Sequence, residues 1–255
     1  MNEQLRWITH FLDAHSIPYW VDYGTLLGLM REGDLLKKGR KAPDNDIDIS
    51  MWSRYEPYLR NVLPLVREAG YVIRRYSYNG FVYKYFLIPK IITTQWSHDL
   101  PPAPFIDLSL YRKHGDHAWC PECYPTNPAR LGYLRYLHPL LRDSLYKVLW
   151  GWSIPQIRFM NTWITVDVSA WPWRAFAYDV GTSWIPRFYF DNITRARGFD
   201  VLLPRDWESY LEFRYGDWKT PVEEWRYWID DGGFQRKPPN EIIAGLEKAS
   251  NEVTT

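Results

Sequence analysis

The spacing of apolar residues changes along this chain, and the changes mark its secondary-structure elements. Apolar residues at positions 5, 8, 11 and 12 recur at helical intervals, which predicts an amphipathic helix over residues 2–15. The short apolar stretch 19–23 predicts a strand, and residues 26–31 predict a second helix that follows a Gly24-Thr25 turn. A strand, a turn of small residues and a helix therefore follow one another near the N-terminus.

Strict alternation follows in the segment Asp46-Ile47-Asp48-Ile49-Ser50. Side chains alternate between the two faces of a strand, so the two isoleucines are expected in the core. Both aspartates then point together from the opposite face. This shared face is the first candidate for chemistry.

The middle of the chain continues the mixture of helices and strands. We expect a helix over 54–69, interrupted or kinked at Pro64, and strands over 71–76, 81–88 and 105–111. The last of these strands places Asp107 on the face opposite Ile106 and Leu108. It is a second strand with a carboxylate among apolar neighbours.

Periodicity then lapses through residues 112–130, and a helical segment over 131–149 precedes an aromatic stretch, 150–190, whose pattern fits no single element. Residues 199–204 predict a strand, and Asp206 begins a helix that Gly216 ends. These elements predict an α+β fold in one domain, residues 1–234, with an insertion at about 112–190. Residues 235–255 are expected to form a polar tail with one weak helix.

Composition narrows the class of protein. The chain has 255 residues with 31 Lys and Arg against 30 Asp and Glu, so charge gives no general case for binding nucleic acid or an anionic membrane. No long apolar run and no signal peptide are visible, and we expect a cytoplasmic protein without a transmembrane segment. The 15 Trp and 19 Tyr either stack on sugars or bases, or fill the core.

The turn and the alternating strand together predict a phosphate and metal site. Backbone amides at Gly24-Thr25 and the following helix N-terminus suit a phosphate. Asp46 and Asp48 suit a divalent cation that bridges the same phosphates, and Asp107 would complete an oxygen site for Mg²⁺ or Mn²⁺. Three basic residues on predicted strands, Lys84, Arg74 and Arg75, either line this phosphate site or are ordinary solvated charges.

Residues 19–50 resemble the signature of the LicD family, to which fukutin and fukutin-related protein also belong. Two later segments agree, Phe105-Ile-Asp-Leu and the segment 203–218, which ends in Tyr-Gly-Asp-Trp. Residues 37–41 are extra by comparison with the family, and Ala42-Pro43 stands where the family usually has Pro-Trp. The three matching segments keep the family's order along the chain.

The resemblance implies a nucleotidyltransferase-like mixed sheet with helices. It further implies transfer of phosphocholine, ribitol phosphate or a similar alcohol phosphate from a CDP-linked donor to a hydroxyl of a carbohydrate or glycoconjugate, with release of CMP. The matched metal and catalytic residues are Asp46, Asp48 and Asp107. The donor and phosphate residues that match are Tyr23, Gly24, Thr25, Gly28 and Arg31, with Arg31 contacting the diphosphate.

Two other functions stay open from the residues alone. A glycosyltransferase also uses Asp-x-Asp with manganese to hold a nucleotide sugar, although without a Gly-Thr helix before the aspartates. A catalytically silent glycan-binding protein would use the tryptophans for stacking and leave the aspartates structural.

A second cluster of candidate metal ligands has the spacing His114-x-x-His117-x-x-Cys120-x-x-Cys123. These four side chains either bind a structural Zn²⁺ or are two histidines and two ordinary reduced cysteines.

Overall fold

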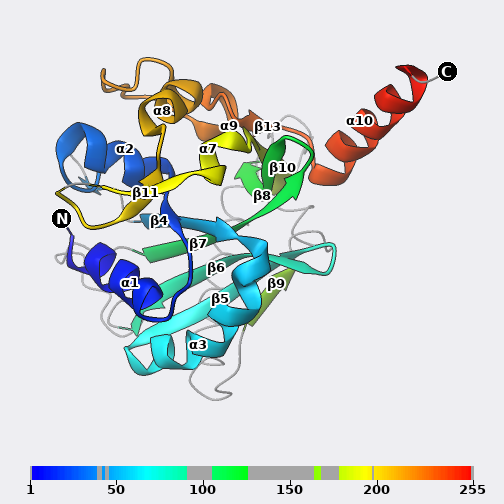
Figure 1. The fold of residues 1–255 in the computed structure, drawn as a ribbon. Helices are drawn as coiled ribbons and strands as arrows, with labels where there is room; N and C mark the ends of the chain where they lie inside the picture. The colour runs from blue at the N-terminus through cyan, green and yellow to red at the C-terminus, as the bar shows by residue number, and fades with distance from the viewer. Residues whose placement is uncertain are drawn as a thin grey trace, which may run out of the picture.

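The computed structural model describes residues 2–38, 42–43, 46–90, 105–125, 164–167, 178–196 and 198–253. The predicted helical segment 131–149 and most of the aromatic stretch 150–190 lie outside these residues. Over the described residues the fold is α+β, as the sequence predicts, with one large mixed sheet and helices on both sides of it (Figure 1).

The described elements follow the predicted order along the chain. The helices are α1 (Glu3–Ala14), α2 (Tyr23–Glu32), α3 (Glu56–Glu68), α7 (Phe188–Asp191), α8 (Trp207–Tyr215), α9 (Tyr227–Asp230) and α10 (Pro239–Val253), with a 3-10 turn at Ser53–Tyr55. The strands are β1 (Trp20–Val21), β2 (Lys37–Lys38), β3 (Ala42–Pro43), β4 (Asp46–Trp52), β5 (Tyr71–Tyr78), β6 (Phe81–Pro89), β7 (Phe105–His114), β8 (His117–Pro125), β9 (Ile164–Asp167), β10 (Tyr178–Pro186), β11 (Ile193–Arg195), β12 (Leu202–Pro204) and β13 (Phe234–Gln235).

The main sheet joins nine strands among the described residues in the order β13-β10-β8-β7-β6-β5-β9, with β4 paired to β7 and β1 paired to β4. Strands β4 and β7 are parallel, whereas β5, β6, β7 and β8 form an antiparallel meander. Figure 1 shows α2, α7 and α8 gathered on one side, near β4, and α3 beside β5. The parallel pair β4–β7 therefore lies next to these three helices, the first of which, α2, contains the predicted Gly24-Thr25 turn.

Two expectations about the helices are corrected by the structure, and a third is confirmed. Helix α2 begins at Tyr23, so Gly24 and Thr25 form its first turn rather than a separate turn before it. Helix α3 runs through Pro64 without interruption. Helix α8 has the predicted limits, with Asp206 at its N-cap position and Gly216 at its end, although the Asp206 side chain makes no capping hydrogen bond within the described residues.

The loss of periodicity after residue 111 does not mark a loop. Strand β7 continues to His114, and β8 follows as a further strand of the main sheet. Pro121 obscures the pattern because proline is rare inside sheets. Pro121 is tolerated because it lies beyond Trp119, where the pairing of β8 with β7 ends. On the edge of β8 that faces β7, its missing N–H therefore costs no ladder hydrogen bond.

Large aromatic rings fill much of the core. The largest fully buried side chains of the described residues include Trp20, Tyr85, Tyr111, Tyr210 and Phe190. Trp20 stacks on Phe190 with ring centroids 4.5 Å apart and an interplanar angle of 22°. For these rings the core-filling interpretation holds, because none of them reaches solvent where a sugar could stack.

The C-terminal segment contains the one helix that the sequence predicts there. Helix α10 spans 15 residues and extends away from the rest of the molecule in Figure 1. None of the described helices is long and apolar enough to cross a lipid bilayer.

Candidate active site

The first turn of α2 and strand β4 are joined by a reciprocal pair of contacts. The Asp48 backbone N–H donates to Thr25 Oγ1 at 2.8 Å. In return, the Thr25 N–H and hydroxyl donate to Asp48 Oδ2 at 3.4 and 3.5 Å. The helix N-terminus favours a negative charge, so the Asp48 carboxylate lies where the helix stabilises it. The predicted turn and the predicted Asp-x-Asp strand therefore form one unit.

Strand β7 brings the third aspartate to this unit. The parallel register pairs Asp46 with Phe105 and Asp48 with Asp107. Directly paired residues of neighbouring strands project from the same face. All three predicted aspartates therefore lie on one face of the sheet, as the alternation predicts.

Lys84 also belongs to this face. Its Nζ lies 3.1 Å from Asp107 Oδ2 and 3.3 Å from Glu122 Oε2. Burial alone would lower the pKa of Lys84, but the carboxylates of Asp107 and Glu122 raise it well above the usual range. Lys84 is therefore a fixed cation of the site and not an ordinary solvated charge.

Asp107 has an unusual environment for a carboxylate. Burial raises its pKa to about 6, although Lys84 opposes this rise and Asp46 adds to it. Its Oδ1 is buried and has no hydrogen-bond partner among the described residues. A buried carboxylate oxygen without a partner is uncommon and calls for a ligand or a catalytic role.

The carboxylates fit a divalent cation in their chemistry. They supply only hard oxygen donors, and no described residue bonds to Asp107 Oδ1. The aspartates fit a cation in their donor atoms and in their common face of the sheet. Their side chains are not arranged around an ion, because no three His, Cys, Asp or Glu side chains of the described residues are already placed to hold one. Asp48 is bonded to Thr25, and Asp107 Oδ2 is bonded to Lys84.

Tyr23, the first residue of α2, is held in a strained conformation. Its φ of +45° lies in the left-handed region, which costs about 1 to 2 kcal/mol for a residue with a Cβ. Its N–H donates to Asp22 Oδ1 at 2.8 Å, and its hydroxyl lies 2.9 Å from Glu122 Oε1 and 2.8 Å from the Tyr111 hydroxyl. Strain of this kind persists where surrounding contacts impose it, and it is frequent at functional sites.

Two of the predicted donor residues lie elsewhere on α2. A Cβ on Gly28 would meet Asp34 O and Leu36 N at 2.6 Å, so close packing explains this glycine. Arg31 lies six residues beyond Thr25, about 9 Å along the helix axis. It donates to Trp218 O at 3.4 Å and to Glu32 at 2.9 Å, while its buried Nε has no hydrogen-bond partner within the described ranges.

The predicted zinc ligands are not brought together. Cys120 and Cys123 are three positions apart on β8, and this odd separation directs them to opposite faces of the strand. His117 stacks on Trp184 with ring centroids 5.2 Å apart. Burial raises the pKa of Cys123 to about 11, which opposes the thiolate form that zinc requires. The described geometry gives the zinc interpretation no support.

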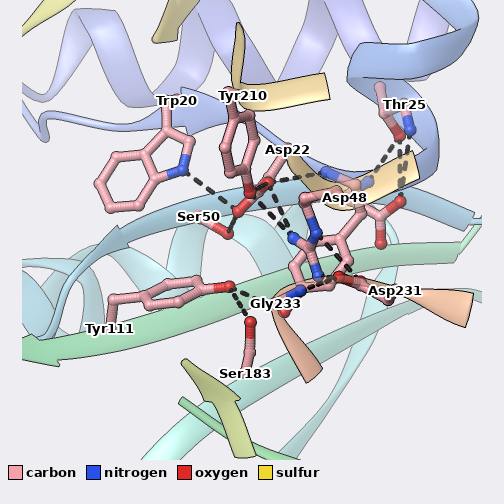
Figure 2. Close-up of polar contacts among 12 residues, drawn as sticks. Trp20, Asp22, Thr25, Asp48, Ser50, Tyr111, Ser183, Tyr210, Asp231 and Gly233 are labelled. Atoms are coloured by element: carbon pink, nitrogen blue, oxygen red, sulfur yellow. Dashed lines mark hydrogen bonds and ion pairs between the residues drawn. The ribbon is translucent and has the colours of Figure 1, made fainter. Parts of the chain in front are cut away.

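Sequence reasoning missed the residues behind the turn. Asp22 accepts hydrogen bonds from Trp20 Nε1 at 3.2 Å, Ser50 Oγ at 2.7 Å and the Tyr210 hydroxyl at 2.5 Å (Figure 2). Its position directly before the turn was the available signal, since aspartate is a preferred residue before a helix. The partners come from distant segments, which no local pattern identifies.

Comparison with known proteins agrees with this arrangement. Residues 16–145 match the LicD/FKTN/FKRP nucleotidyltransferase domain, and this range includes the turn and all three aspartates.

Two curated relatives are uncharacterized proteins of Rickettsia. One, from Rickettsia prowazekii, is 34% identical over 71 residues, which are 28% of this chain and 25% of that protein. The other, from Rickettsia typhi, is 33% identical over 72 residues, which are 28% of this chain and 22% of that protein. The match thus spans about a quarter of the length of these relatives. Since the family match covers half of the chain and contains the site, the chain belongs to the LicD/FKTN/FKRP nucleotidyltransferase-domain family, which is generally one of transferases.

Proposed function

We propose that this protein is a metal-dependent transferase that moves an alcohol phosphate from a CDP-linked donor to a glycan hydroxyl and releases CMP. The observation that carries the proposal is the joined unit of Thr25 and Asp48 with Asp107 beside it, whose buried Oδ1 has no partner in the part of the chain that the structure describes. The family supports transfer to glycans at this coarser level.

The chemistry requires one bond to form and one to break. The glycan hydroxyl oxygen attacks the phosphorus that carries the alcohol, and the bond from that phosphorus to the bridging oxygen of CMP breaks. CMP leaves with the electron pair. A bound Mg²⁺ or Mn²⁺ would neutralise the phosphate oxygens and the departing CMP. Asp46, Asp48 and Asp107 are the residues that would hold it.

The chain's own groups have separate tasks in this proposal. The Tyr23 and Thr25 N–H groups donate to Asp22 and Asp48, so the Gly24 N–H at the start of α2 is the group that binds and orients a donor phosphate. Lys84 holds the Asp107 carboxylate in place. Asp107 accepts the hydroxyl proton, a task that suits a carboxyl whose pKa burial raises to about 6, because the group is ionised at neutral pH yet basic enough to take a proton.

Thermal unfolding with a panel of ligands tests the proposal. The panel contains CDP-choline, CDP-ribitol, CDP-glycerol and UDP-sugars, each with and without Mg²⁺ or Mn²⁺. A ligand at 100 times its dissociation constant stabilises the protein by about 2.7 kcal/mol. We expect one CDP-alcohol to stabilise the wild type only with metal, and Asp46→Asn and Asp48→Asn to abolish this effect.

Asp206→Asn is the matched control, because Asp206 is exposed and makes no capping hydrogen bond. Its ligand response should equal that of the wild type. A response to UDP-sugars alone would make the protein a glycosyltransferase. No response to any nucleotide would favour a silent glycan-binding protein.

Turnover tests the proton acceptor separately. With the CDP-alcohol identified above and a glycan acceptor, CMP release should fall at least 100-fold in Asp107→Asn. Near-normal release at saturating metal would show that Asp107 is not the base.

A further inference from the structure

A buried ionic cluster lies directly behind the first turn of α2. It consists of Asp22, Arg214 and Asp231, whose side chains are 0%, 1% and 1% exposed. The three residues come from the start of α2, from α8 and from the segment after α9. A buried ion pair often adds little to the free energy of unfolding, so stability alone does not explain this cluster.

All three nitrogens of the Arg214 guanidinium donate hydrogen bonds to neighbouring side chains. Its Nε and Nη2 both donate to Asp231 Oδ2, at 3.0 and 2.5 Å. Its Nη1 donates to the Tyr210 hydroxyl at 2.8 Å and lies 3.5 Å from Asp22 Oδ1. Asp231 is itself fixed by the Gly233 N–H at 2.8 Å (Figure 2). The guanidinium plane therefore has one orientation.

The flat face of that plane supports Tyr23. The guanidinium carbon lies 3.8 Å from the centroid of the Tyr23 ring. On the hydroxyl side, the same ring is held by Glu122 and Tyr111. Tyr23 has a positive φ that its surroundings must impose, and its backbone determines where the following N–H groups point.

We propose that Arg214 is a positioning residue for donor binding, which holds the N-terminus of α2 in place through the Tyr23 ring and the Asp22 carboxylate. This inference rests on the proposed function. Arg214 does not touch the donor, because it is buried beneath Tyr23. It fixes the position at which the N–H group of residue 24 meets a donor phosphate.

Arginine suits this task better than lysine. The guanidinium has a planar fork that bonds Asp231 through two nitrogens and leaves a flat face for an aromatic ring. Lysine would keep the charge but lose the fork and the stacked face. Arg214→Lys should therefore not restore what Arg214→Met loses.

The test is the affinity for CDP in the presence of Mg²⁺, measured by calorimetry well below the melting temperature of each variant. Arg214→Met and Arg214→Lys should each weaken CDP binding at least tenfold. Tyr23→Gly should weaken it by a similar factor. The double variant Tyr23→Gly/Arg214→Met should be no weaker than the worse single variant, because Arg214 acts through Tyr23.

Leu63→Ala is the matched control for lost stability. Leu63 is fully buried on α3, beside β5 and away from α2, so its truncation destabilises the fold without touching the cluster. Its CDP affinity should stay within twofold of the wild type. If Arg214→Met does not fold, Asp231→Asn replaces it. This variant keeps the shape of the cluster and should weaken CDP binding at least threefold.

The outcomes separate the two proposals. If the wild type binds CDP and the cluster variants bind it equally well, Arg214 is structural only and this inference is wrong while the proposed function stands. Additive losses from Tyr23→Gly and Arg214→Met would also overturn it, because the two residues would then act independently. If the wild type binds neither CDP nor any CDP-alcohol, the proposed function fails and this inference falls with it.

Discussion

Asp48 on β4 and Asp107 on β7 are direct neighbours across a parallel strand pair. Two carboxylates on one face repel each other unless cations or hydrogen-bond donors compensate them. On one side Thr25 donates to Asp48, and on the other Lys84 donates to Asp107. Each carboxylate of the pair is thus compensated by a donor, and the effect of the Asp107 charge on stability can be measured.

Stability should depend on pH through Asp107. Burial raises the pKa of Asp107 to about 6 in the folded protein, whereas an unfolded aspartate has a pKa of about 3.9. Between these values the unfolded chain binds fewer protons, so this group lowers stability as the pH rises from about 4 to about 6. Its effect is constant outside that window.

Asp107→Asn removes this contribution. Relative to the wild type, the free energy of unfolding of this variant should increase by about 2 kcal/mol between pH 4 and pH 7. Urea unfolding in EDTA at four pH values measures this. Asp206→Asn serves again as the exposed control and should show no such trend. A difference between Asp107→Asn and the wild type that stays constant with pH would contradict the assignment.

Asp22→Asn should be strongly destabilising. The carboxylate is fully buried and accepts from Trp20, Ser50 and Tyr210, so its loss leaves Arg214 with less compensation. Breaking a buried ion pair from one side costs about 3 to 5 kcal/mol. Denaturant unfolding gives the value.

Arg195→Met is the matched surface comparison. Arg195 is 43% exposed and pairs with Asp13 and Asp200 at 3.0 Å. Exposed pairs contribute up to about 1 kcal/mol, so this variant should lose little. Equal losses from Arg195→Met and Asp22→Asn would show that burial does not decide the effect here.

Thr25→Val should separate the hydroxyl from the shape of the side chain. Valine keeps the volume of Thr25 but leaves the Asp48 N–H without its acceptor. Losing such a bond costs about 1 to 3 kcal/mol when a buried group stays unpaired. Thr25→Ser keeps the hydroxyl and should lose less than half as much free energy of unfolding. A serine variant as unstable as the valine variant would point to the methyl group instead.

Gly28→Ala should destabilise α2 although alanine favours helices. The new Cβ would meet the backbone at Asp34 and Leu36, and overpacking of this kind costs about 1 to 3 kcal/mol. Gly33, whose φ is +73°, has open space around it, so Gly33→Ala should cost only the backbone strain of about 1 kcal/mol. Thermal unfolding of the two variants should therefore rank Gly28→Ala as the less stable. The reverse order would contradict the close approach at Gly28.

Local patterns predicted what depends on neighbours in sequence. The alternation around Ile47 and Ile49 predicted strand β4 and the shared face of its aspartates, and both isoleucines are fully buried. Strand β8 was missed because Pro121 disguises its period. A proline is tolerated there only because of where the β7–β8 register ends, which the local sequence does not reveal.

Long-range relationships lie beyond such patterns. Arg214 meets Asp22 across 192 positions of the chain, and Lys84 meets Glu122 across 38. Each residue looks like an ordinary surface charge in its own segment. These charged residues come together only because of the order in which the strands pair and because α8 lies near the start of α2 in the fold.

The contact between Asp22 and Arg214 can form only late in the synthesis of residues 22–214. The segment that begins α2 is synthesised about 190 residues before its buried partners at 210–231. At about 5 to 20 residues per second, this delay is roughly 10 to 40 s during translation. Throughout that interval Asp22 lacks Tyr210 and Arg214 as partners, and the Tyr23 ring lacks the Arg214 guanidinium beside it. The turn at the start of α2 is therefore completed only after residues 210–231 have left the ribosome.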